Sequence, residues 1–244
     1  MHRIPSLLES QHLSLPISAI LKPSQGGDTM NTKKGVPFSI SHDNEAITGC
    51  TTSTVIWHTP FTTGTCFSLA PHTDISAETY GEDKLLHVLQ GSIVISAPSM
   101  TAPVQMGQII LIPKHTPFAV QTEEGAVYIE LYTKEDTTMN LDGGKIYQLA
   151  ELVPCQEGKI INRDIIASEH VKLALMTFGE GTGLTEHAAP GEALIMALEG
   201  KAIITYEGKD HPIKAGESFV FEKGGRHAVK ADGPFKMALL LTLE

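Results

Sequence analysis

The chain is poor in aromatic residues, cysteine and positive charge. Of its 244 residues, 6% are aromatic, and only one is tryptophan. Lys and Arg number 18 against 28 Asp and Glu, which gives a formal net charge of −10 with no basic cluster. This balance argues against nucleic acids and anionic membranes as partners. No apolar run reaches the roughly 18 residues that a membrane-spanning helix needs.

The three cysteines, Cys50, Cys66 and Cys155, are an odd number without the spacing of a disulfide framework. We expect each to be a reduced thiol that packs as a small buried hydrophobe. The first residues lack the charged and then apolar pattern of a secretory signal. Together these features predict a cytoplasmic protein.

The sequence contains a faint copy of itself. The tripeptide LQG at 89–91 recurs as LEG at 198–200, an offset in residue number of 200 − 91 = 109, and the same offset pairs Gly107 with Gly216. No gap is needed from about residue 49 to about residue 122, so the repeat has the length of a domain. We expect an N-terminal extension over 1–45, one module over 46–135 and a second over 136–244.

The extension has no convincing counterpart in the second half. Residues 5–21 contain enough Leu and Ile for a short helix, or for a strand added to the other module. The segment PSQGGD at 23–28 is turn-rich and predicts a mobile linker, and Met30 is an alternative start.

Short apolar runs bounded by Gly, Pro, Asp or Ser predict an all-β fold. The expected strands of the first module are 53–57, 65–69, 84–89, 92–96, 108–112, 118–121 and 127–131. Those of the second are 160–166, 172–178, 193–198, 201–206, 218–222, 228–231 and 235–241. Between the modules, IYQLAEL at 146–152 has helical spacing before Pro154, which predicts a helical connector.

Two stretches of the second module resemble the two sequence motifs of the cupin superfamily. They are EHAAPGEALIMALEG at 186–200 and GESFVFEKGGRH at 216–227, where Glu222 replaces the proline of the family. LAELV at 149–153, QEG at 156–158 and the His-x-Ala-Pro-x-x-Ala-Leu stretch from His187 are similar to a group of short bacterial conserved-barrel cupins with no settled activity. The resemblance implies two tandem jelly-roll barrels, a bicupin.

The resemblance also implies where a metal would lie. Cupins place two His, a Glu and a further His inside the barrel, where they hold a divalent metal such as Fe, Mn, Ni or Zn. Here His187 and His227 occupy the first and last of these positions, but Ala189 and Ala193 occupy the other two. Glu192 is the nearest additional carboxylate, although its parity along the strand requires a bulge to turn it inward.

The first module places Glu78, Tyr80, Lys84 and Phe118 at the same four positions, a set that suits no metal. Because a charge buried alone is costly, we expect Glu78 and Lys84 to pair. This barrel then has a structural role. Three of the histidines in this half are interpreted as ordinary solvated or hydrogen-bonded side chains. They are His72 and His115 in loops and His87 on the strand face opposite Lys84.

Three interpretations of the second module stay open: two relic histidines, a weak metal site, or a metal-free pocket in which the histidines act as acid, base or hydrogen-bond donor. Ala189, Ala193, Ile195, Phe221 and Met237 would line that pocket, and Arg226 at its rim could meet an anion. The first functional hypothesis is binding of a small organic molecule, with carboxylated compounds as one candidate class. The second is a metal-dependent oxygenase, isomerase or lyase. Family resemblance further implies a homodimer or an intrachain pseudo-dimer.

Overall fold

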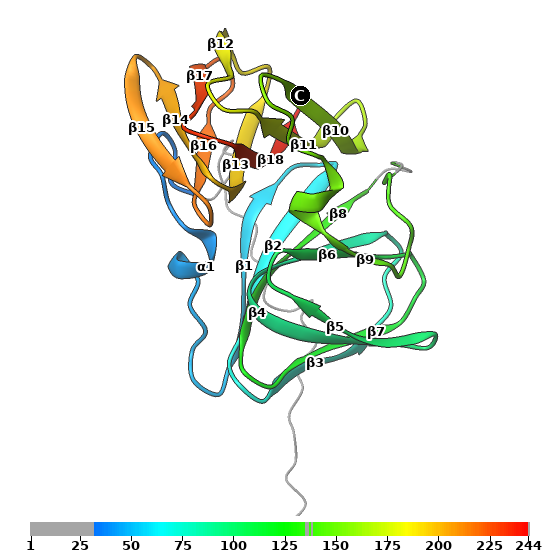
Figure 1. Cartoon of the computed structure of the whole chain (residues 1–244). Helices are drawn as coiled ribbons and strands as arrows, with labels where there is room; N and C mark the ends of the chain where they lie inside the picture. The colour runs from blue at the N-terminus through cyan, green and yellow to red at the C-terminus, as the bar shows by residue number, and fades with distance from the viewer. Residues whose placement is uncertain (1–31, 135–136, 138, 244) are drawn as a thin grey trace, which may run out of the picture.

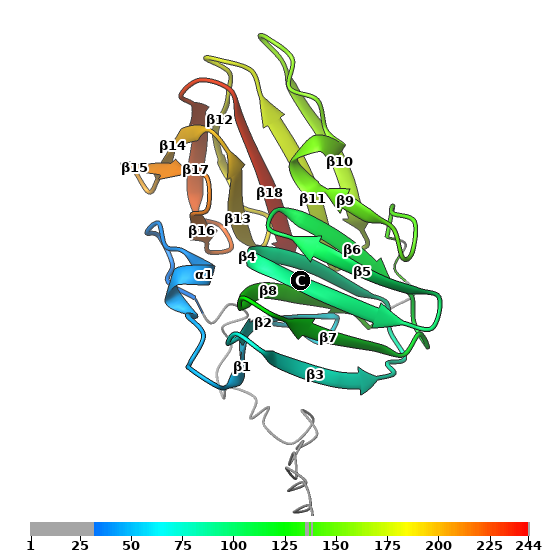
Figure 2. The same ribbon diagram turned by 60° about the horizontal axis from the view of Figure 1, so that its bottom comes forward.

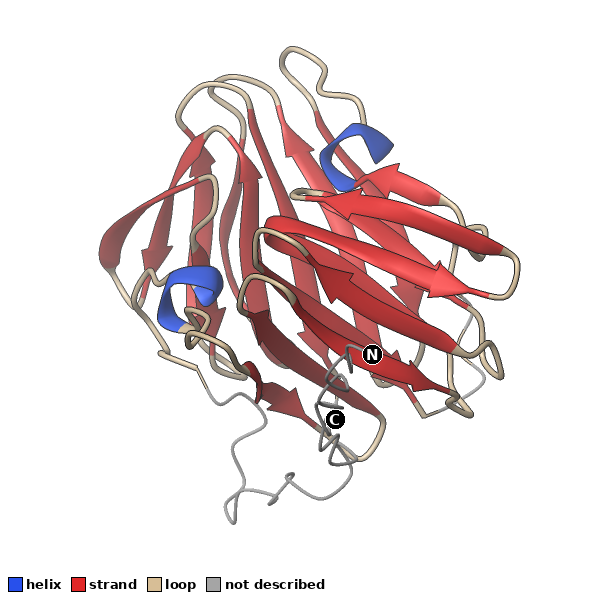
Figure 3. Cartoon of the chain, turned by 90° about the horizontal axis from the view of Figure 1, so that it is seen from below, coloured by secondary structure: helices blue, strands red, loops and turns tan. Residues whose placement is uncertain are grey.

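The computed structural model describes residues 32–134, 137 and 139–243, and it shows two β-sheet modules (Figure 1). The predicted all-β class and the two tandem barrels are confirmed. Figure 3 shows that strands dominate the described residues, with two short helical segments on opposite sides of the molecule. The expectations for residues 5–21, 23–28 and Met30 fall outside the described residues.

The N-terminal module follows the short helix α1 (Ile40–Asp43) and contains eight strands. They are β1 (Thr51–His58), β2 (Thr62–Leu69), β3 (Thr73–Glu78), β4 (Lys84–Ala97), β5 (Met100–Gln105), β6 (Gln108–Ile112), β7 (Phe118–Thr122) and β8 (Ala126–Thr133). The main path of its sheet runs β1-β2-β8-β4-β6 and ends at β9 (Ile146–Gln148) from the connector, and β3, β7 and β5 complete the barrel.

The connector supplies β9 (Ile146–Gln148) and the 3-10 helix η2 (Leu149–Leu152). The strands of the C-terminal module are β10 (Ile160–Ala167), β11 (Val171–Phe178), β12 (Gly183–Ala188), β13 (Glu192–Glu199), β14 (Lys201–Tyr206), β15 (Lys209–Lys214), β16 (Ser218–Phe221), β17 (Arg226–Ala231) and β18 (Phe235–Thr242). They form two sheets, β10-β11-β18-β13-β16 and β12-β17-β14-β15.

The offset between the two sequence copies holds element by element. β18 starts at Phe235 and β8 at Ala126, so 235 − 126 = 109, and β15 and β5 are related in the same way. Other strand boundaries agree within one or two positions, except that β4 continues through the stretch where the second module has both β13 and β14. The sequence repeat is therefore a duplication of the whole barrel.

Alternation along the strands separates three apolar cores. One fills the N-terminal barrel and includes Phe67, Val88 and Tyr128. The second fills the C-terminal barrel and includes Ile195 and Phe221. The third contains residues of both modules, such as Leu131 and Leu240, so the outward faces of the two large sheets pack against each other. Figure 2 shows the strands of the two sheets on either side of this shared core.

The segment before each module pairs with the edge strand of the other module. Tyr147 of β9 is registered with Ile109 of β6, and Phe38 forms an isolated bridge with Ser218 of β16. Both contacts obey the repeat offset, since 147 − 38 = 109 and 218 − 109 = 109. The helical segments α1 and η2 obey it as well, since 149 − 40 = 109. The expectation that residues 1–45 have no counterpart is therefore wrong for residues 38–43, whose equivalence the sequence hides because FSISHD and YQLAEL share no residue.

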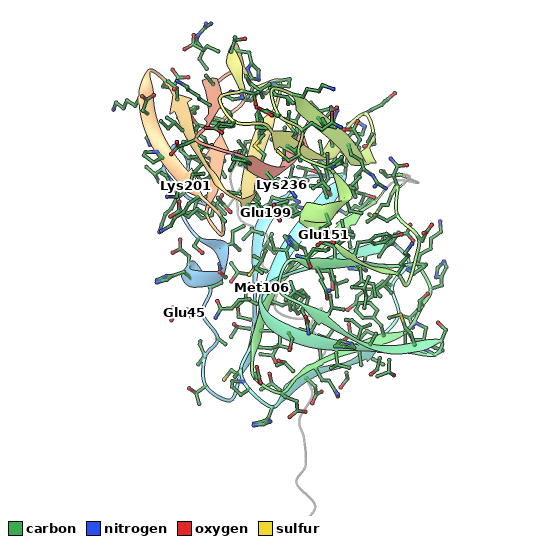
Figure 4. The ribbon with its side chains drawn as sticks, viewed as in Figure 1. Glu45, Met106, Glu151, Glu199, Lys201 and Lys236 are labelled. Atoms are coloured by element: carbon green, nitrogen blue, oxygen red, sulfur yellow. The ribbon has the colours of Figure 1, made fainter. Side chains whose placement is uncertain are left out.

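The helix predicted over 146–152 is only partly formed. Residues 146–148 form β9 instead, because the edge of β6 offers backbone groups that a strand can satisfy. Residues 149–152 adopt the 3-10 helix. Lys236 of β18 fixes this helix by donating a hydrogen bond to the carbonyl of Ala150 at 2.9 Å while it pairs with Glu199 at 2.9 Å. Figure 4 shows Lys236 and Glu199 close to Glu151, where the connector meets the C-terminal module.

The cysteines are free thiols, but only one of them is buried. Cys66 lies in the core between the modules, and burial raises the pKa of its thiol to about 12. Cys50 and Cys155 are exposed, so the expectation of burial is wrong for these two. Among the described residues, no helix is long and apolar enough to span a bilayer.

The segment before the N-terminal module, which pairs with β16 of the other module, gives a stability prediction. Lys34 pairs with the largely buried Glu192 at 2.7 Å, and the amides of Gly35 and Phe38 donate hydrogen bonds to the carbonyls of Val220 and Ser218. We expect Lys34→Met to lower the free energy of unfolding by about 1–2 kcal/mol, because it leaves the Glu192 carboxylate without its cation. Hydrogen exchange of the Phe38 amide should accelerate.

The matched control is Lys33→Met, whose ion pair with Asp43 is solvent-exposed and should contribute little. Equal effects of the two variants would show that the Lys34 ion pair does not hold the segment.

Candidate functional site

His187 and His227 lie side by side at one end of the C-terminal barrel. β12 carries His187 and β17 carries His227, and the two residues are directly opposite in the antiparallel pairing of these strands. Their ring centroids are 4.2 Å apart at an interplanar angle of 52°. Glu78 and Phe118, which the repeat aligns with these histidines, form the corresponding pair in the N-terminal barrel. The structure therefore brings together the two predicted histidines.

Backbone carbonyls set the orientation of both rings. Nδ1 of His187 lies 2.9 Å from the carbonyl oxygen of Thr185, and Nδ1 of His227 lies 3.1 Å from that of Gly225. Because a carbonyl oxygen can only accept, each Nδ1 must carry the proton and donate it. In the neutral rings, each Nε2 then has an unprotonated lone pair. Histidines that bind metals or accept a proton are commonly oriented in this way.

The two imidazoles differ in their surroundings. His187 is exposed, whereas His227 is 8% exposed and stacks on Phe221 with a centroid distance of 4.0 Å. Burial lowers the pKa of His227, and the neighbouring His187 lowers it further against the opposing effect of the Gly225 carbonyl. His227 is therefore a neutral base at pH 7 that faces both the barrel interior and a solvent-exposed partner.

The five predicted lining residues belong to one apolar cluster inside this barrel. Ala189, Ala193, Ile195, Phe221 and Met237 are all buried, and Phe178, Phe219 and Phe235 pack in the same cluster. Ala189 is fixed by two backbone hydrogen bonds to the turn before β17, at Gly224 and Gly225. Ala189 and Ala193 contribute no polar atoms from their side chains. His187 and His227 are therefore polar groups next to an apolar barrel interior.

The donor set does not fit the metal that the cupin motifs imply. Ala189 and Ala193 provide no ligand atoms, and Glu192 is paired with Lys34 instead of turning toward the histidines. Among the described residues, no group of three or more His, Cys, Asp or Glu side chains is arranged to hold a metal. Structural and catalytic zinc sites use at least three protein ligands, so two imidazoles alone are a poor site.

Arg226 lies at the rim, directly opposite Ala188 in the strand pairing. Its guanidinium donates from Nε and Nη2 to one carboxylate oxygen of Glu186. Its side chain is exposed, and the Glu186 carboxylate raises its pKa. The cation that the sequence suggested for an anionic ligand is thus already paired within the protein.

The N-terminal barrel contains an ion pair in the corresponding region, but with a different partner from the one predicted. Nζ of Lys84 lies 2.9 Å from Oε1 of Glu130, and both side chains are buried. The rings of Tyr80 and Tyr132 are each centred 4.1 Å from the ammonium. The expected Glu78–Lys84 pair is therefore wrong. Glu78 instead accepts a hydrogen bond from the Tyr80 hydroxyl, and burial together with this carboxylate raises the pKa of Tyr80.

The sequence contains a signal for Glu130 that lies outside the motif positions. β8 reads AVYIELYT, and Glu130 is the one charged residue in this otherwise apolar or neutral strand. Since alternate residues of a strand share a face, Glu130 lies with Tyr128 and Tyr132 on the barrel side. A lone acidic residue at such a position requires a buried cation.

The three histidines of the first module that we interpreted as ordinary side chains differ from one another. His72 is exposed and its Nδ1 lies 3.1 Å from a Glu123 carboxylate oxygen, and His115 is also exposed, as predicted. His87 does face away from the barrel interior, but it is only 8% exposed and lies between the two modules. Burial lowers its pKa to about 4. The expectation of a solvated or hydrogen-bonded His87 is therefore wrong.

Comparisons with known proteins show a cupin domain in the second module and a shared fold over most of the chain. Residues 174–243 match the cupin domain model. The fold is similar to that of a Cupin 2 conserved barrel domain protein from Leptotrichia buccalis, at 25% identity and a TM-score of 0.79 over 88% of this chain and 100% of that one. No curated protein matches the chain.

Two more distant structures show the same fold. A salicylate 1,2-dioxygenase from Pseudaminobacter salicylatoxidans has 11% identity and a TM-score of 0.56, over 75% of this chain and 71% of that one. A mutant of Bacillus subtilis oxalate decarboxylase has 15% identity and a TM-score of 0.53, over 88% and 79%. With the family model and the duplicated barrel, these comparisons lead to one conclusion: residues 174–243 belong to a cupin domain, and the chain as a whole has the two-barrel cupin fold.

Proposed function

We propose that this protein binds a small organic molecule at the end of its C-terminal barrel, with His187 and His227 as the polar contacts. The observation that carries the proposal is the matched orientation of the two rings, in which both Nδ1–H groups are held by carbonyls. Two convergent imidazoles beside an apolar interior are typical of a small-molecule site. The N-terminal barrel, which contains the Lys84–Glu130 ion pair, has a structural role in this proposal.

The chemistry of the site favours a ligand that carries a hydroxyl group. A neutral His227 offers an acceptor at Nε2, and a hydroxyl group can donate to it. A carboxylate would need a cation, but the nearby Arg226 is paired with Glu186. Phe221, stacked on His227, offers an apolar surface for the carbon skeleton. A hydroxylated or phenolic molecule therefore suits the site better than the simple carboxylate considered from the sequence.

A metal-dependent oxygenase, isomerase or lyase is the second candidate. The carbonyl-held Nδ1–H groups favour it, because they leave the Nε2 atoms free to ligate Fe, Mn, Ni or Zn. The two alanines weigh against it, since they occupy the positions where further ligands would stand. The names of the dioxygenase and the decarboxylase describe those proteins, and at 11% and 15% identity they carry only the fold to this chain.

The proposal is tested by ligand screening with thermal unfolding. We expect phenols and hydroxylated acids to raise the melting temperature of the wild type in a concentration-dependent manner, because a ligand that binds only the folded state stabilises it. His187→Ala and His227→Ala should abolish the shift, whereas His72→Ala, a change at an exposed loop histidine, should preserve it. Identical shifts in all four proteins would overturn the proposal.

Metal analysis of untagged protein separates the two candidates. Binding of an organic ligand in protein free of metal supports the first. Stoichiometric Fe, Mn, Ni or Zn that disappears in His187→Ala, together with ligand binding that requires it, would replace the first candidate with the second.

The charge of −10 and the absence of a basic cluster also lead us to propose that neither nucleic acid nor a membrane is a partner. A cytoplasmic location and a homodimer remain predictions. Because the two modules already bury a shared core, the chain offers within itself the contact that a dimer of single barrels would make.

A further inference from the structure

A second polar site lies between the modules, away from the barrel end. A cavity of about 60 Å³ is lined by His87 and Leu89 of β4, Met196 of β13, Ser218 of β16 with the preceding Glu217, and Ser41 of α1. α1 packs against β4, and Figure 2 shows it beside β4, β13 and β16. A separate apolar cavity of about 30 Å³ adjoins it through the shared side chains of His87 and Met196.

Two largely buried polar side chains, His87 and Ser218, line the larger cavity, so their polar atoms have access to whatever occupies it. His87 is 8% exposed and Ser218 is 4% exposed, and neither side chain makes a hydrogen bond within the described part of the chain. The hydroxyl of Ser41 meets only that of Ser39, at 3.3 Å. Buried polar groups are almost always satisfied in native proteins, because leaving one without a partner is costly.

The duplication supplies an internal control for this cavity. By the repeat offset, His87 corresponds to Met196, Ser218 to Ile109 and Ser41 to Ala150. His87 and Met196, which correspond to each other, line both cavities, but the related position has apolar side chains in place of both serine hydroxyls, and the barrels pack there equally well. The two serine hydroxyls are therefore not a requirement of the fold, which indicates that they serve something that occupies the cavity.

We propose that this cavity between the barrels binds a small uncharged molecule that carries hydroxyl groups, held by His87, Ser218 and Ser41. A water molecule, which has one non-hydrogen atom, needs at least about 10–15 Å³ of cavity volume. The cavity of about 60 Å³ therefore accommodates about four to six non-hydrogen atoms. A short diol has this size and can satisfy the imidazole and both serine hydroxyls.

Charge complementarity excludes the ionic alternatives. Glu217 lines the cavity, and its negative charge disfavours an anion there. The Glu217 carboxylate already accepts a hydrogen bond from the Lys214 amide at 3.0 Å and lies 3.9 Å from the Lys214 ammonium, so it is a weak attractor for a second cation. Burial also keeps His87 neutral at pH 7, since its pKa is lowered to about 4. A neutral hydroxylated molecule avoids the cost of burying a charge.

The test is a titration of the full chain with propane-1,2-diol, propanoate and propylammonium, three probes of similar size and different charge. The readout is the methyl resonance of Met196, because this side chain lines both cavities and is retained in all the binding-site variants. The resonance is assigned by its loss in Met196→Leu. A local resonance is needed because polyols also stabilise proteins without binding to a site. We expect a saturable shift with the diol only.

The variants replace each polar residue with its counterpart in the other half of the repeat. His87→Met and Ser218→Ile should weaken diol binding at least tenfold, and Ser41→Ala, a milder change, should weaken it less. His187→Ala should leave it unchanged, which separates this site from the one at the barrel end. A linear, unsaturable shift, equal affinity in His87→Met and the wild type, or preference for either ion would each overturn the proposal.

Discussion

Replacement of Lys84 by methionine is expected to lower the free energy of unfolding by about 3–5 kcal/mol, because it leaves the buried Glu130 carboxylate without its cation. The ion pair is 2.9 Å long, and the side chains are 6% and 9% exposed, so solvent screens it little. Urea unfolding of the wild type and Lys84→Met measures the effect.

The double variant Lys84→Met/Glu130→Leu is the control. It removes both charges, and leucine is the residue that the C-terminal barrel has at the corresponding position, Leu239. Because well-packed apolar residues often replace a buried ion pair at little cost, we expect the double variant to recover most of the lost stability. Two results would show that Lys84 does not stabilise the fold by neutralising the buried Glu130 carboxylate. One is a single variant as stable as the wild type, and the other is a double variant less stable than the single one.

Stability is expected to fall as the pH is lowered from 6.5 to 4, and His87 is expected to account for about 3 kcal/mol of the loss, because its pKa drops from 6.5 in the unfolded chain to about 4 between the barrels. The unfolded state binds the proton in this range and the folded state does not, so acid favours unfolding. The contribution is fully present above pH 6.5 and is lost as the pH falls toward 4. Denaturant midpoints measured across this range give the dependence.

His87→Met isolates this contribution, because it installs the residue of the other module and removes the titrating group. The lowered pKa of His227 acts in the same direction, so the informative quantity is the difference between the wild type and the variant. Identical pH profiles for the two proteins would contradict the burial of a neutral His87 between the modules.

The sequence predicted the strands that face a core and missed those that do not. β6 and β14 lie where the apolar runs predict them. β3, β12, β5 and β15 are absent from the prediction, and all four are largely exposed with few apolar residues. β5 and β15 also contain Pro103 and Pro212, which weaken a strand signal. Their pairing comes from neighbouring strands, which no local pattern reveals.

The candidate site was predictable in its residue types but not in its geometry. The repeat and the motif spacing placed His187 and His227 in equivalent positions, and the structure brings them together. The partner of Lys84 depended on strand β8, which lies 46 residues further along the chain and outside both motifs. His87 was assigned to the correct face, but its burial required knowledge that the second module covers that face.

The protonation of the two imidazoles tests the proposed site most directly, read from the nitrogen resonances of His187 and His227 in the free and ligand-bound protein at neutral pH. We predict that both Nδ1 atoms carry the proton, that Nε2 of His227 is unprotonated, and that a hydroxylated ligand shifts the Nε2 resonances while those of His72 stay in place. Protonated Nε2 with bare Nδ1 in either ring, or a ligand that binds without moving these resonances, would contradict the proposed site.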